Sequence, residues 1–95
     1  MELKHIQIVN VHKESIDKCL FYIYKLLSSD ALADRVALMG CIMDAIWLFE
    51  HTNECPEILS RVVPTLHDML LECVKTRFSK AHGMLRDLHY FVASC

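Results

Sequence analysis

Apolar side chains recur at helical spacing in four segments of this chain, and short polar stretches separate the segments. Positions i, i+3, i+4 and i+7 are apolar in each segment, so each can turn one apolar stripe toward a core. The pattern predicts helices over residues 12–28, 31–51, 56–73 and 78–93. We therefore expect an all-α fold of four main helices in two hairpins, forming a single domain.

The second predicted helix differs from the others because it is apolar nearly all round. Val36, Ile42 and Met43 lie on one side of it, and Cys41 and Ala45 on the other. A helix with no polar face is usually covered on both sides. We expect this helix to be sandwiched between neighbours.

Two parts of the pattern leave alternatives open. Pro64 lies inside the third helix, where a proline costs about 3 kcal/mol, so the helix is expected to bend or to split there. Residues 1–11 fit either a short extended segment or a helix that leads into the next one.

The chain contains an internal repeat with an offset of 43 residues. Gly40, Asp44 and Trp47 return as Gly83, Asp87 and Tyr90, and the apolar positions of the first and third helices correspond at the same offset. The two repeats cover about residues 12–54 and 55–95. A period of this length with two helices per unit is typical of HEAT and armadillo repeats.

The segment 45–71 (AIWLFEHTNECPEILSRVVPTLHDMLL) resembles a HEAT or armadillo junction. It carries an apolar turn with Trp47, a short polar loop, and then the phrase Val62-Val63-Pro64-Thr65-Leu66. Arg61 stands where armadillo units usually have glycine, so the resemblance is HEAT-like. It implies stacked helical hairpins and a binding role, without an activity. Since two such hairpins rarely bury their faces alone, it also implies a piece of a longer solenoid or a chain that self-associates.

The composition predicts apolar surface on the outside of the fold, and the cysteines indicate in which cellular compartment the chain works. Apolar residues make up 54% of the chain, above the usual ~45–50%, so some apolar surface is expected to face a neighbour. Cys19, Cys41 and Cys73 fall in apolar helical patterns, as reduced thiols do. With five cysteines and no signal peptide, we expect the cytoplasm or the nucleus. No apolar run is long enough for a membrane span.

The repeated trios are the first candidate site. Their i, i+4, i+7 spacing places Asp44 with Trp47, and Asp87 with Tyr90, on one face of each second helix. Side by side in a solenoid, they would form a ladder that grips an extended partner peptide. The alternative is that the glycines allow close helix approach while the aspartates bond the Trp N–H or the Tyr O–H.

Phe21 and Tyr22 are the second candidate site, because they point away from the apolar stripe of the first helix. Exposed aromatic residues often mark protein contacts. Packing against residues 1–11 is an equally good interpretation.

Other functions find little support. His51 with Cys55, and His82 with His89, lack the spacing of a metal motif, so no metal or cofactor is expected. No nucleophile motif or phosphate-binding loop occurs, so we expect no enzyme. Four cations near the C-terminus are a weak nucleic-acid footprint: Lys75, Arg77, Lys80 and Arg86.

The sequence as a whole favours a protein-protein interaction module that binds a partner peptide or helix. The alternative is a small homodimeric four-helix regulatory bundle, with nucleic acid as its further contact.

Overall fold

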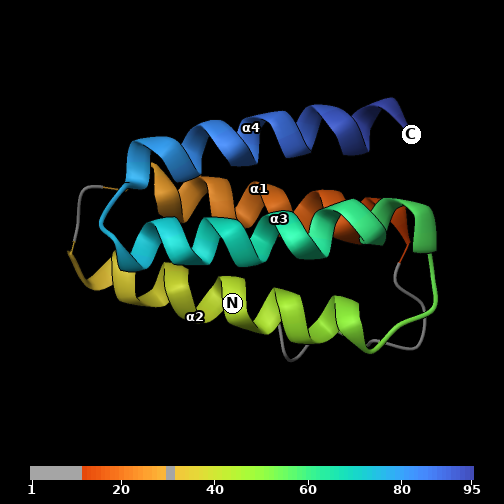
Figure 1. Cartoon of the computed structure of the whole chain (residues 1–95), viewed down its shortest axis with the longest axis horizontal. Helices are drawn as coiled ribbons and strands as arrows, with labels where there is room; N and C mark the ends of the chain where they lie inside the picture. The colour runs from red at the N-terminus through yellow and green to blue at the C-terminus, as the bar shows by residue number, and fades with distance from the viewer. Residues whose placement is uncertain (1–11, 30–31) are drawn as a thin grey trace.

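The computed structural model describes residues 12–29 and 32–95 and places four helices in them (Figure 1). They are α1 (Lys13–Leu27), α2 (Leu32–Glu50), α3 (Pro56–Val74) and α4 (Phe78–Ser94). The all-α fold with two helical hairpins is thereby confirmed, with helix bounds close to those that the apolar spacing predicts. The two interpretations of residues 1–11 lie outside the described residues.

The helices form a closed ring in which successive helices are neighbours and the last returns to the first. α1 packs on α2, α2 on α3, α3 on α4, and α4 on α1. In Figure 1, α4 and α2 lie at opposite edges with α1 and α3 between them. Short connections and consecutive contacts of this kind are typical of an up-and-down bundle.

The ring separates the two helices that were expected to lie side by side. Solenoid layers would place α2 beside α4, but their described contact is confined to one end, where the Arg35 guanidinium lies 4.5 Å from the centre of the Phe78 ring. The expectation that Trp47 and Tyr90 form one ladder is therefore wrong. The family resemblance to HEAT repeats stays a prediction.

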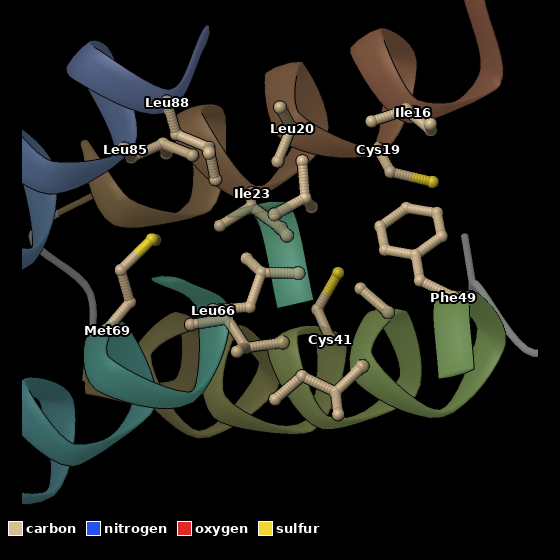
Figure 2. Close-up of a cluster of buried hydrophobic side chains, with 14 of the residues drawn as sticks. Ile16, Cys19, Leu20, Ile23, Cys41, Phe49, Leu66, Met69, Leu85 and Leu88 are labelled. Carbon is tan, nitrogen blue, oxygen red and sulfur yellow. The ribbon is translucent and has the colours of Figure 1, made fainter. Parts of the chain in front are cut away.

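One apolar core fills the ring. Ile16, Leu20 and Ile23 from α1 meet Phe49 from α2 and Leu66 from α3, all with almost no exposure (Figure 2). Ala81, Leu85, Leu88 and Val92 line it from α4. The i, i+3, i+4 positions thus face inward on every helix, as the sequence predicts.

Cys19, Cys41 and Cys73 lie in this core, which confirms their prediction as buried positions. Burial raises the pKa of Cys19 to about 11 and that of Cys41 to about 12, because the thiolate would lose its hydration. Burial, with the Glu72 carboxylate as a smaller cause, also raises the pKa of Cys73. These thiols therefore act as small neutral core groups.

Pro64 does not break α3, which runs without interruption from Pro56 to Val74. Pro64 is exposed, so the carbonyl of Ser60 that loses its helical partner faces the solvent side. Pro56 occupies the first turn, where a missing N–H does no harm. The predicted split at Pro64 is wrong because its ring points away from the core.

A Schellman motif ends α3 and turns the chain into α4. The Arg77 N–H donates to the Glu72 carbonyl at 2.8 Å, and the Thr76 N–H donates to the Cys73 carbonyl at 3.0 Å. Thr76 adopts the left-handed conformation, with φ of 58°. The Glu72 carboxylate is largely buried and lies 3.9 Å from Arg77 and 3.5 Å from Lys80, so it ties the turn to α4.

Within residues 12–29 and 32–95, the expectation that α2 is sandwiched is wrong, although its sequence is apolar on both sides. Leu38, Ile42, Ala45 and Phe49 are buried in the core, whereas Val36 and Met43 on the opposite face are mostly exposed. The bundle therefore covers only one face of its most apolar helix. Within the described residues, no helix combines the length and apolar character needed to cross a membrane.

We predict that Gly83→Ala stabilises the protein. Gly83 lies inside α4, and a Cβ added there meets no atom within 4 Å. The substitution restricts the unfolded chain, so we expect a gain of about 0.5–1 kcal/mol in unfolding free energy by urea titration. A loss of stability would mean that this face of α4 is covered.

We predict that Thr76→Gly also stabilises the protein, by about 0.5–1 kcal/mol, because glycine adopts a left-handed conformation without steric strain. Thr76→Ala is the matched control, since alanine keeps the strain. Equal thermal midpoints for the two variants would contradict the explanation.

We predict that stability declines as the pH rises above about 9. Unfolded thiols ionise near pH 9, whereas Cys19 and Cys41 stay protonated up to about pH 11 and 12 in the fold. The native state then binds more protons, so unfolding free energy falls by roughly 1.4 kcal/mol per pH unit for each thiol. Below pH 9, the Cys19 and Cys41 thiols make their full contribution to the unfolding free energy.

Urea titrations at pH 7, 9 and 10 measure this decline. The double variant Cys19→Ala/Cys41→Ala should lose less stability between pH 9 and 10 than the original chain. It retains all three tyrosines, so their ionisation affects both proteins alike. Parallel declines would show that the thiols are not responsible.

Candidate functional site

A groove of about 430 Å³ runs between α1 and α4 on the outside of the bundle. Its size falls within the range of ordinary ligand sites. Its floor is formed by buried leucines and its sides by larger residues. We call it the α1/α4 groove, and it is lined by Leu20, Phe21, Tyr24, His82, Leu85, Arg86, His89, Tyr90 and Ala93.

Aromatic rings form the walls of the groove. The ring of Tyr24 packs edge to face on the imidazole of His82, with centres 4.9 Å apart, and on Phe21 at 6.4 Å. Tyr90 is 71% exposed on the α4 side. In the Tyr24–His82 and Phe21–Tyr24 pairs, the two rings fix each other's orientation, and part of their area stays exposed. Exposed aromatic area of this kind contributes most to protein binding.

Three basic side chains line the groove. They are Arg86, His82 and His89, and no carboxylate lines it among the described residues. The nearest acid is Asp17, whose Oδ1 is buried and lies 2.9 Å from Nε2 of His89. Asp17 is thus engaged by the wall of the groove, while the Arg86 guanidinium, 3.9 Å from Asp87, is mostly exposed.

The structure brings together two of the six residues that the sequence singled out. Phe21 and Tyr90 both line the α1/α4 groove. Asp87 lies beside it, with its carboxylate near Arg86. Tyr22 is half-buried and packs against the core, so the expectation that it stands in water is wrong.

Asp44 and Trp47 lie elsewhere, on α2. Trp47 is 49% exposed and stacks on the imidazole of His51, with ring centres 4.3 Å apart. The Trp47 carbonyl also lies 2.8 Å from Nδ1 of His51. Asp44 is half-buried. The trios therefore belong to different surfaces, because α2 and α4 occupy opposite corners of the ring.

The close-approach interpretation of the repeated glycines is also wrong for the part of the chain that the structure describes. A Cβ added to Gly40 or to Gly83 meets nothing within 4 Å. No neighbouring helix of the described bundle needs the space that these glycines leave.

Sequence reasoning missed four groove residues: Tyr24, His82, Arg86 and His89. Their spacing held a signal. Tyr24 follows Phe21 by three positions, and the α4 residues fall at i, i+4 and i+7 on one face. What the spacing could not show is that α1 and α4 are neighbours.

The geometry offers little for catalysis or metal binding. No serine, threonine or cysteine lines the groove within the described part of the chain. No group of three or more histidine, cysteine or acidic side chains there could hold a metal ion. Two of the four basic residues near the C-terminus, Arg77 and Lys80, are paired with Glu72.

Comparisons of the chain with models of known protein families, with curated proteins and with solved structures found no match.

Proposed function

We propose that this chain is a protein-binding module that holds an amphipathic, acidic helix of a partner protein in the α1/α4 groove. The observation that carries the proposal is the combination, in one groove, of uncovered aromatic rings with basic side chains and no acidic lining. A cytoplasmic or nuclear setting belongs to the same proposal, and the buried unpaired thiols of Cys19, Cys41 and Cys73 support it.

The shape of the groove favours a helix as the occupant. Two antiparallel helices flank it, and the leucine floor continues from Leu20 to Leu85. A third helix can rest in such a channel with apolar side chains at i, i+4 and i+7 against the floor. The uncovered rings of Phe21, Tyr24 and Tyr90 then close over its sides.

The charge of the groove favours an acidic flank on that helix. Arg86 is positioned to pair with a glutamate or aspartate of the partner. Such pairs at the rim chiefly determine which partner is chosen and how fast it associates. Most of the affinity would come from the aromatic area.

Single-stranded nucleic acid is the competing occupant, because bases also stack on aromatic rings next to cations. Binding a nucleic-acid strand would need a row of unpaired cations along the path of its phosphate backbone. Glu72 pairs with Arg77 and Lys80, so two of the four cations near the C-terminus are already balanced. The observations therefore favour a protein.

Selection from a displayed library of helical peptides tests the proposal. We expect enrichment of sequences with leucine or phenylalanine at i, i+4 and i+7 and with glutamate or aspartate on one flank. Binding of a selected peptide, measured by fluorescence anisotropy, should weaken about tenfold or more in Tyr24→Ala and in Arg86→Glu.

Lys75→Glu is the matched control for Arg86→Glu, because it makes the same charge change outside the groove. It should leave the peptide affinity within about twofold. Equal losses in both variants would show a general charge effect. Failure of any acidic amphipathic peptide to bind, together with binding of a single-stranded oligonucleotide, would overturn the proposal.

A further inference from the structure

The outer face of α2 is an apolar stripe that nothing in the described bundle covers. Val36 is 71% exposed, Met43 57% and Trp47 49%, and Gly40 between them is exposed too. We call these four residues the α2 stripe. Their spacing of four, three and four is the seam spacing of paired helices, and none of the four positions is charged, although Asp44 borders them.

α3 extends the apolar surface on one side of the stripe. His67 of α3 lies 3.8 Å from Glu50 of α2, so its helix face borders α2. Leu71 and Val74 follow at i+4 and i+7 on that face and are 54% and 60% exposed. Since α2 and α3 are antiparallel neighbours, these two residues lie toward the Val36 end of the stripe.

We infer that a second copy of this chain covers the surface, with the two α2 helices antiparallel across a two-fold axis between Cys41 and Ile42. In that register Val36 faces the partner subunit's Trp47, and Gly40 faces the partner subunit's Met43. Each of the four positions meets another stripe position, so one surface matches itself, as a two-fold interface requires.

The sizes of the side chains support this register. Gly40 leaves open space that no helix of its own chain fills, and Met43 is a flexible side chain suited to such a gap. Trp47, the largest residue of the stripe, would rest against the smaller Val36, with Leu71 beside it. Large residues thus meet small ones at both layers, as in well-packed helix pairs.

The inferred interface is separate from the α1/α4 groove. α2 and α4 are at opposite corners of the ring, so pairing through α2 leaves the groove of each subunit open. A dimer of this kind would carry two grooves and bind a two-site partner more tightly than a single subunit does. The dimer can exist whether or not the groove binds a partner helix.

Sedimentation equilibrium of the full chain, over a wide concentration range, tests the inference. We expect a dimer whose dissociation constant rises about a hundredfold or more in Met43→Glu, because that substitution buries an unpaired charge in the interface. Tyr90→Glu is the matched control: Tyr90 is an exposed residue of α4, away from the α2 stripe, and its variant should dimerise normally. Circular dichroism of each variant shows whether the helices are retained.

Disulfide trapping tests the register, in a background with Cys55→Ser and Cys95→Ser. Antiparallel pairing brings position 36 of one copy to position 47 of the other. An equimolar mixture of Val36→Cys and Trp47→Cys chains should therefore cross-link, and either variant alone should not. A chain that stays monomeric at all concentrations, a dimer unaffected by Met43→Glu, or cross-linking of each single variant would overturn the inference.

Discussion

The packing of α1 against α4 is the contact on which the rest of the structure depends. It closes the ring, so the apolar stripes of all four helices meet in one core rather than in two stacked layers. Closure also creates the α1/α4 groove, because the aromatic residues beside the leucine floor lie off the inward-facing stripes of α1 and α4. The same closure sends α2 to the corner farthest from α4.

Electrostatics refine this arrangement without driving it. The Glu72 carboxylate, held between Arg77 and Lys80, joins the end of α3 to the start of α4. Removing one partner of such a nearly buried group leaves an uncompensated charge, so the cluster helps to specify one connection. It also neutralises two cations at the start of α4. The basic lining that remains belongs to Arg86, His82 and His89.

The molecule thus has two differently built surfaces. The α1/α4 groove is concave, aromatic and basic, which suits an acidic partner of another kind. The α2 stripe has no charged residue among its four positions and is self-complementary in size, which suits another copy. A chain with more apolar residues than one small core can bury must leave some of them on its surface. Here the exposed apolar residues gather on two surfaces, the α1/α4 groove and the face of α2 with the adjoining part of α3.

The sequence alone was sufficient for the helices, since helical periodicity is local: the stripe from Ile16 to Leu27 on α1 and its counterparts on α3 and α4 gave the inward faces. It also pointed to Phe21, because a large aromatic residue off an apolar stripe has no place in the core, and to Tyr90 through the repeated trio. Which helices are neighbours depends on contacts between residues far apart in the chain, such as Asp17 with His89. Repeat spacing suggested α2 beside α4, yet only tertiary packing could decide between layers and a ring. That decision separated Trp47 from Tyr90 and brought Tyr24 to His82.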